Sequence, residues 1–323
     1  MSAPDTQFPA SPTLAENFDP GLTQKYSGAL NRVVNRDGRF NVHRVDSSWS
    51  DANPYTFMIS VPWPVFWAIV VAAYVLINLL FASLYEFLGV GHVKGAESSD
   101  QTIQFLNLFF FSAHTLTTVG YGNMYPNGPI ANFIASAEGL LGLMGFAIAT
   151  GLLFGRFSRP SARFGFSSTM ALAPYRDGGS LQFRIVNRRS NNLIEVQARV
   201  MLMTVETKDG RHSRKYALLE LERDQVLFLP LTWTVVHPIN EKSPFYGKTA
   251  EDLKRLQAEV VVMMRGYDET FGQTVYARYS YRYDEIAWGV KFAAAFDVDH
   301  KGDLLLWVDR VGLTEPAPLS GTE

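Results

Sequence analysis

Cysteine is absent from the 323-residue sequence, which excludes disulfides, thiolate metal sites and cysteine nucleophiles. Charged residues are scarce, at 19% against 47% hydrophobic residues, a balance that does not favour an ordinary soluble enzyme. The net charge is -2, and no face of lysine and arginine is dense enough to neutralise a phosphate backbone, so nucleic acid is not expected as a partner. The N-terminus lacks the basic start and apolar stretch of a cleaved signal peptide, so the first hydrophobic segment is expected to direct insertion.

The hydrophobic residues concentrate in the part of the chain before about Arg159. Residues 61–84 carry no formal charge, and a second apolar run covers residues 129–155. Each run is long enough to cross a hydrocarbon core of about 30 Å at about 1.5 Å per residue. We therefore predict two transmembrane helices. A carboxylate inside a membrane is costly, so Glu138 in the second helix is expected to face protein or water rather than lipid.

Two shorter segments accompany these runs. Residues 103–116 are hydrophobic but too short to span, which favours a re-entrant helix, with a buried core helix as the alternative. Residues 48–60 mix aromatic and polar side chains as in a short helix in the membrane interface, although a linker broken by Pro54 fits the same pattern. Residues 1–47 are polar and predict a flexible N-terminal segment.

The distribution of arginine predicts the orientation. Basic residues precede the first span and follow the second, whereas the loop between the spans offers only Lys94. By the positive-inside rule both termini are cytoplasmic. The residues concerned are Arg32, Arg36, Arg39 and Arg44 on one side and Arg156, Arg159 and Arg163 on the other.

Beyond Arg163 the sequence predicts a domain of short strands. Strings of β-branched residues alternate with turn signals such as Asp177-Gly178-Gly179, which is typical of a sandwich of two antiparallel sheets over residues 161–323. One short helix is predicted at 250–257, with Thr249 as its N-cap. The predicted strands are 181–186, 194–204, 216–221, 226–229, 231–237, 259–265, 274–283 and 304–307.

The run Thr117-Thr118-Val119-Gly120-Tyr121-Gly122 follows the re-entrant segment directly. Selection of a dehydrated monovalent cation requires stacked oxygens, and backbone carbonyls supply them if successive residues turn them toward one axis. Glycine at 120 and 122 permits the unusual backbone path, and four such loops form the filter of potassium channels. The same letters could occur by chance in a soluble loop, but their place between a re-entrant helix and a second span argues against this. One subunit cannot surround an ion, so the run also predicts an oligomer.

Four stretches resemble the prokaryotic inward-rectifier potassium channels, the KirBac group. They are FFFSAHTLTTVGYGNMYP (109–126), GLLFGRFSRP (151–160), LTWTVVHPINEKSPFYG (231–247) and YARYSYRYDEIAWG (276–289), and the resemblance extends over residues 48–311. It implies a homotetramer in the bacterial inner membrane, with a slide helix and pore domain over residues 48–160. An immunoglobulin-like cytoplasmic sandwich is implied to follow. Potassium is then the permeant ion, and no cofactor or enzymatic activity is expected.

The resemblance also assigns pore residues. It places potassium at Thr118, Val119, Gly120 and Tyr121, with Gly122 ending the filter. It places the cavity at Phe146, a hinge at Gly142 and the helix-crossing gate at Phe154, where four aromatic rings would close a narrow pore by dewetting. Ordinary helix packing is the alternative for Phe154, and close helix approach is the alternative for Gly142.

Other positions concern regulation. Glu195 and Glu285 match acidic positions of the cytoplasmic pore, although each could be a solvated surface carboxylate. Relatives that rectify strongly carry an acid at the cavity position, so Phe146 implies weak block by magnesium or polyamines. His114 stands where family members commonly have Glu or Gln behind the filter, and a neutral packed histidine is the simpler interpretation. A site for phosphoinositide-like anionic lipid is implied at Arg156, Arg159 and Arg163, which topology alone would also explain.

Two other functions fit parts of the sequence. A less selective cation channel would lack the filter tyrosine or its neighbours, and a membrane-anchored binding module would show an aromatic-lined pocket in the sandwich. An enzyme has little support, because His237 and Asp284 lack a neighbouring nucleophile or metal-ligand spacing.

Overall fold

The computed structural model describes residues 20–22, 25–26, 32–43, 45, 53–158, 163–176, 178–208 and 211–319. The chain divides into two compact units, one of residues 45–159 and one that joins the N-terminal segment to the residues from 160 onward. Arg44, Arg159 and the first part of the predicted interfacial helix, residues 48–52, lie outside the described residues.

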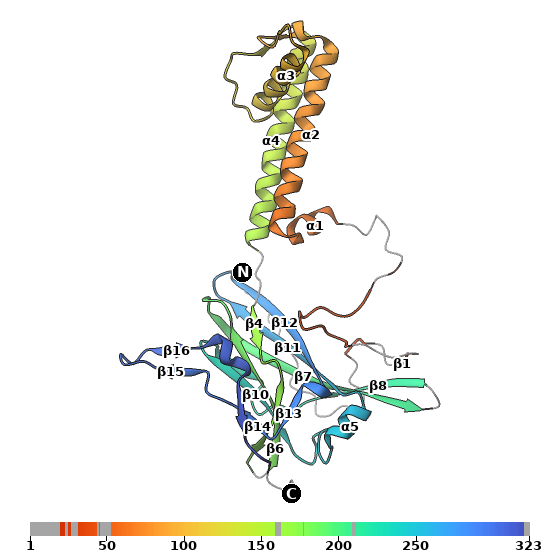
Figure 1. Ribbon diagram of the computed structural model, residues 1–323, viewed down its shortest axis with the longest axis vertical. Helices are drawn as coiled ribbons and strands as arrows, with labels where there is room; N and C mark the ends of the chain where they lie inside the picture. The colour runs from red at the N-terminus through yellow and green to blue at the C-terminus, as the bar shows by residue number, and fades with distance from the viewer. Residues whose placement is uncertain are drawn as a thin grey trace, which may run out of the picture. The chain divides into compact units, whose positions relative to one another are not determined.

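The first unit is built from four helices, α1 (Pro54–Ser60), α2 (Trp63–Leu88), α3 (Gln101–Leu116) and α4 (Pro129–Phe157). α1 lies across one end of the α2–α4 pair, and α3 packs beside the other end (Figure 1). Pro54 begins α1 rather than breaking it, because the first turn of a helix does not need its amide hydrogen. The side chains of Asn53 and Asp100 accept hydrogen bonds from the free amides that begin α1 and α3.

α2 and α4 are long and apolar enough to cross a membrane, by length and composition. Only 17% of the apolar window of α2 and 6% of that of α4 is buried within the chain. Burial of apolar surface drives the folding of water-soluble domains, so such exposed apolar helices require lipid or further protein around them. The segment between them contains the short α3 and a two-stranded pairing of β2 (Val93–Lys94) with β3 (Tyr125–Pro126).

The second unit contains two packed sheets. The six-stranded sheet has the order β1 (Lys25–Tyr26), β8 (Arg211–Leu218), β7 (Leu193–Lys208), β11 (Glu259–Asp268) and β12 (Gln273–Arg282), with β9 (Gln225–Phe228) beside β7. The five-stranded sheet has the order β10 (Thr232–Ile239), β6 (Gly178–Asn187), β5 (Met170–Tyr175) and β13 (Ile286–Trp288), with β4 (Phe164–Phe166) beside β6. The sequence predicted two antiparallel sheets, but β13 pairs with β5 in parallel, so this sheet is mixed.

Alternating residues of the two sheets form one core. Leu181, Phe183 and Ile185 of β6 point inward and meet Val260 and Val262 of β11. The predicted helix is present as α5 (Ala250–Arg255), with the Thr249 side chain as its N-cap.

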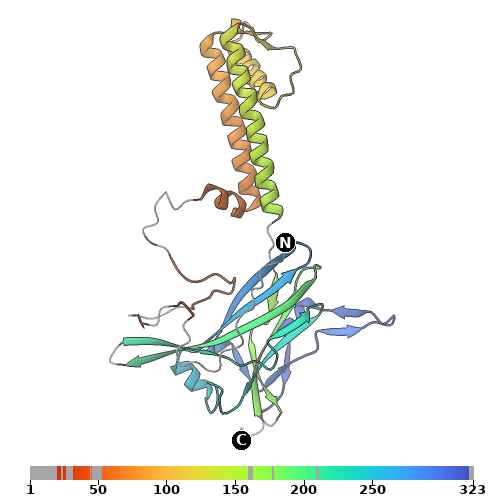
Figure 2. The same cartoon turned by 180° about the vertical axis from the view of Figure 1, so that it is seen from behind.

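Two short ribbons lie outside the sandwich sheets. β14 (Val290–Phe292) pairs with β17 (Thr314–Pro316), and β15 (Phe296–Val298) pairs with β16 (Leu304–Leu306). Figures 1 and 2 both show the β15–β16 hairpin extending away from the sandwich. Of these four strands only β16 was predicted, as 304–307, because segments of three residues are too short to show a period of two.

The N-terminal segment is in part packed against the sandwich. Val33 and Val34 are buried, and their backbone amides donate to the buried carboxylate of Glu259 at 3.0–3.4 Å. Arg32 donates to the Ser280 hydroxyl and carbonyl at 3.0 and 2.8 Å and to the Glu285 carboxylate. The prediction of a flexible segment is therefore wrong for residues 32–43. The residues that anchor them lie some 250 positions away in the sequence, so local composition does not reveal the contact.

The contact made by Glu285 depends on pH. Its burial opposes ionisation, but the Arg282 amide and the guanidinium groups of Arg36 and Arg32 outweigh burial and lower its pKa. The stabilisation by the carboxylate is therefore fully present above the ordinary glutamate pKa and is lost as the pH falls through the lowered value.

We predict that Glu285→Gln loosens residues 32–43 at neutral pH. Loss of the charge-assisted bonds is worth about 1–2 kcal/mol, or roughly tenfold faster hydrogen exchange at the Val33 and Val34 amides. Glu251→Gln, at an exposed acid on α5, is the control. The wild type should approach the variant as the pH falls from 7 to 3, after correction for intrinsic exchange. Equal exchange in Glu285→Gln and wild type at pH 7 would contradict the anchoring role.

Candidate functional site

The loop after α3 has an alternating backbone conformation. Thr118, Gly120 and Gly122 have φ values of +59°, +56° and +85°, whereas Val119 and Tyr121 are not in the left-handed region. Alternation of left- and right-handed conformations turns successive carbonyls toward the same side, which an ordinary strand does not do. Two of the three left-handed positions are glycine, for which this conformation carries no steric penalty.

Thr118 is the exception, since a left-handed residue other than glycine costs about 1–3 kcal/mol. Hydrogen bonds to the end of α3 hold it and its neighbours in place. The Thr118 amide donates to Thr115 O at 3.0 Å, and the Val119 amide donates to His114 O at 2.9 Å. Thr118 was predicted as a potassium position, but its left-handed backbone conformation was not predicted.

The loop is largely uncovered in one chain. The Val119 side chain is 51% exposed and that of Tyr121 is 75% exposed. The carbonyls of a single loop can contact an ion from one side only, so a complete cage of oxygens requires further copies of the chain.

A buried polar cluster lies among α2, α3 and α4. The Glu138 carboxylate is fully buried and accepts hydrogen bonds from the Tyr85 hydroxyl at 2.7 Å and from the Ser112 hydroxyl. Ser112 Oγ also lies 3.0 Å from Asn78 Oδ1, so its single proton is shared between the Glu138 and Asn78 oxygens. The expectation that Glu138 faces protein is confirmed, since a buried carboxylate needs such donors. Its two partners, Tyr85 and Ser112, and the neighbouring Asn78 were not predicted, because nothing in the sequence spacing of these residues shows that the three helices bring them together.

α4 approaches α3 closely at Gly142. A Cβ atom added at this position would lie 1.8 Å from the carbonyl oxygen of Leu116, the last residue of α3. No side chain can be accommodated there without displacement of the backbone. Of the two interpretations of this glycine, close helix approach therefore has direct structural support.

His114 contacts the filter loop with its side chain. Its ring meets the Tyr121 ring edge to face, with centroids 4.9 Å apart and planes at 89°. This geometry is favourable for aromatic pairs and agrees with a packed histidine.

Three further residues with predicted roles, Phe146, Phe154 and Arg156, lie on α4. Phe146 and Phe154 are 75% and 72% exposed, so neither packs inside the chain. Arg156 is turned toward its own chain: its guanidinium donates to the carbonyls of Met58 and Val61 at 2.5 and 2.7 Å. It also lies 4.5 Å from the ring centroid of Trp63. These contacts fasten the end of α1 to α4.

The structure separates the other predicted residues. Arg163 and Glu195 are exposed. Glu195 has φ +49° at a bulge of β7, where the register with β11 shifts between Arg265 and Tyr267. Glu285 is occupied by Arg32 and Arg36, so its charge is neutralised within the chain.

The residues weighed for an enzyme have structural partners. His237 is buried, contacts Glu220 O at 2.6 Å and Ser243 Oγ at 2.8 Å, and its pKa is lowered by burial. Asp284 lies 3.5 Å from Arg282. The described part of the chain has no group of three or more His, Cys, Asp or Glu that could hold a metal ion.

Comparison with known proteins covers both units. A family model described as "Inward rectifier potassium channel C-terminal domain" matches residues 164–311, and one described as "Ion channel" matches residues 66–159. The inward rectifier potassium channel Kirbac3.1 of Paramagnetospirillum magnetotacticum is 36% identical over 82% of this chain and 89% of its own. ATP-sensitive inward rectifier potassium channel 12 of Bos taurus is 28% identical, over 86% of this chain and 70% of its own. G protein-activated inward rectifier potassium channel 3 of Mus musculus is 29% identical, over 83% and 74%.

Gly142 and Gly145 provide a matched test of the α3–α4 contact. We predict that Gly142→Ala prevents correct packing of the first unit, because its Cβ would overlap the Leu116 carbonyl. Gly145→Ala should be tolerated, since no atom of the chain lies within 4 Å of a Cβ there. The measurement is the yield of correctly assembled protein by size-exclusion chromatography, together with its melting temperature in detergent. Normal assembly and stability of Gly142→Ala would contradict the contact.

Proposed function

The chain belongs to the inward rectifier potassium channel family, and we propose that it is one subunit of a homotetrameric, potassium-selective channel of the bacterial inner membrane. The observation that carries this proposal is the alternating backbone of residues 118–122 at the end of α3. Membership of an ion channel family also means that the chain is not an enzyme.

Selectivity follows from how the loop replaces water. Four copies of the loop around an axis would present rings of carbonyl oxygens from Thr118, Val119, Gly120 and Tyr121, and the Thr118 hydroxyl would add a further layer. Potassium enters such rings when their field and spacing compensate for its lost hydration. The bonds from Thr118 and Val119 to α3 support this role by limiting inward collapse of the loop.

The two spans make this a membrane protein, and we propose that both termini face the cytoplasm. The clusters of arginine before α2 and after α4 support that orientation. The sandwich would then lie in the cytoplasm, where Glu195 is free to attract cations and Glu285 is engaged by arginine.

For the gate we propose Phe154, and for the cavity Phe146. Both side chains are exposed in one chain, as required of residues that would face a shared axis. Phe146 has no charge to hold a multivalent blocker, so block by internal magnesium or polyamines should be weak. Of the basic residues proposed to contact anionic lipid, Arg163 is exposed, whereas the contacts of Arg156 favour a structural role.

We predict selectivity for potassium over sodium. Purified channel in a planar bilayer under mixed ionic conditions should give a reversal potential close to the potassium equilibrium value, because Thr118–Gly122 is intact. Gly120→Ala should reduce this preference, since alanine at φ +56° is strained. Equal permeability of the two ions in the parent protein would refute the filter assignment.

A separate prediction concerns the gate proposed at Phe154. Phe154→Ala should widen the helix crossing and raise basal rubidium flux into liposomes several-fold, while the potassium preference stays unchanged because the filter lies elsewhere. Phe133→Ala, at a similarly exposed aromatic near the other end of α4, is the control. Unchanged flux in a correctly assembled Phe154→Ala protein would place the gate elsewhere.

A further inference from the structure

A cavity of about 550 Å³ lies on the sandwich, outside its core. Leu181, Phe183 and Ile185 of β6 point into the core, so Gln182 and Arg184 between them face the other side of the sheet. Thr234 of β10 faces the same way, because its neighbours Trp233 and Val235 are core residues. We call this space the outer-face cavity.

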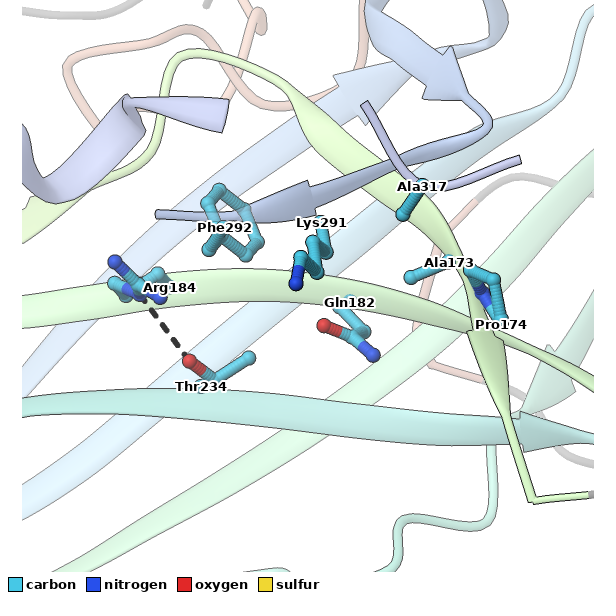
Figure 3. A pocket seen from close by; sticks show the side chains of 8 residues that line it. All are labelled: Ala173, Pro174, Gln182, Arg184, Thr234, Lys291, Phe292 and Ala317. Atoms are coloured by element: carbon cyan, nitrogen blue, oxygen red, sulfur yellow. Dashed lines mark hydrogen bonds between the residues drawn. The ribbon is translucent and has the colours of Figure 1, made fainter. Parts of the chain in front are cut away.

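The β14–β17 ribbon forms the opposite wall. Lys291 and Phe292 of β14 line the cavity together with Ala317, which follows β17. Figure 3 shows Lys291 and Gln182 near one another along the strands and Arg184 beside Phe292, hydrogen-bonded to Thr234. The cavity therefore joins the five-stranded sheet to a ribbon that belongs to neither sandwich sheet.

Arg184 is a buried cation without an acidic partner. Its side chain belongs to a residue only 8% exposed, and its polar contacts are neutral: Thr234 Oγ1 at 3.2 Å and the Ala293 carbonyl at 2.6 Å. Its guanidinium also lies 4.8 Å from the centroid of the Phe292 ring. Within the described part of the chain it forms no ion pair with a carboxylate, and its burial lowers its pKa.

A buried charge left without a counter-charge costs several kcal/mol after relaxation. The neutral contacts reduce that cost but do not neutralise the cation. An anion placed in the cavity would neutralise the Arg184 cation. It could also accept a hydrogen bond from the Thr234 hydroxyl, which accepts from Arg184 and keeps its own proton to donate.

Lys291 supplies a second positive charge at the cavity. It is 56% exposed and lies 3.0 Å from Glu315, which is opposite it on β17 and is not one of the residues that line the cavity. A half-exposed pair of this kind is worth only about 0–1 kcal/mol, so an anion can compete with Glu315 for the ammonium.

We propose that the outer-face cavity binds the phosphate group of a small soluble phosphate ester, with Arg184 and Lys291 as its cationic contacts. Arginine and lysine are the usual protein partners of phosphate. The cavity exceeds the size of a bare phosphate and falls within the range of about 300–1,000 Å³ found for small-molecule sites. Ala173, Pro174 and Ala317 give the rest of the ester an apolar wall.

Phenyl phosphate is a suitable probe for the purified full-length channel in detergent, titrated by calorimetry at constant ionic strength. Lys291→Gln should weaken its binding about tenfold, or about 1.4 kcal/mol, because it removes one charge-assisted contact. Glu315→Gln should strengthen binding several-fold by releasing Lys291 from its pair. Lys254→Gln is the control, since Lys254 is also an exposed lysine beside a glutamate but lies on α5. This opposite response of Lys291 and Glu315 is not expected if the pair only stabilises the ribbon.

Three results would overturn the proposal. The first is no saturable binding of phenyl phosphate, or equal binding by wild type and Lys291→Gln. The second is binding only to vesicles that contain phosphatidic acid, with no response to the soluble ester, which would assign the cations to lipid. The third is a change of oligomeric state in Lys291→Gln without ester binding, which would assign them to a contact between copies. Arg184→Gln should also abolish binding, but its possible effect on folding makes Lys291 and Glu315 the decisive pair.

Discussion

The proposed filter depends on the contact between the end of α3 and the middle of α4. Residues 118–122 adopt a backbone that does not persist by itself, since its carbonyls would otherwise alternate and Thr118 has an unfavourable φ. The loop amides donate to the carbonyls of His114 and Thr115, so the last turn of α3 determines where the loop lies. That turn in turn rests on Gly142, where the backbones of two helices meet without a side chain between them.

The buried carboxylate of Glu138 belongs to the same construction. Without a hydrophobic driving force between helices inside lipid, packing and hydrogen bonds must hold them together. Glu138 receives hydrogen bonds from α2 and α3 and so connects all three helices one turn from Gly142. An apolar residue would pack but would not orient Ser112 and Tyr85, whereas a carboxylate with both partners fixes the three helices in one arrangement.

The sequence permitted the prediction of features that depend on local pattern. The spans, the re-entrant helix, the filter run and most sandwich strands follow from hydrophobic length, period and turn residues, and the structure has them within a few residues at each end. The approach at Gly142, the partners of Glu138 and the anchoring of Val33 by Glu259 could not be predicted in this way. Each depends on which distant residues meet, and one sequence has no signal for that. The left-handed Thr118 is a different case, because its conformation is imposed by its neighbours against its own preference.

The N-terminal segment shows how composition can mislead. Its polarity predicted an unpacked tail, yet Val33 and Val34 complete a small hydrophobic cluster with Met203 and Val261. Only two apolar residues are needed, because Glu259 satisfies their amides and Glu285 satisfies the adjoining arginines. Besides the two valines, the arginines of the segment, Arg32 and Arg36, attach it to the sandwich. Glu285, which the family pattern suggested for the cytoplasmic pore, is neutralised in this contact, so it is less suited to attract cations than the exposed Glu195.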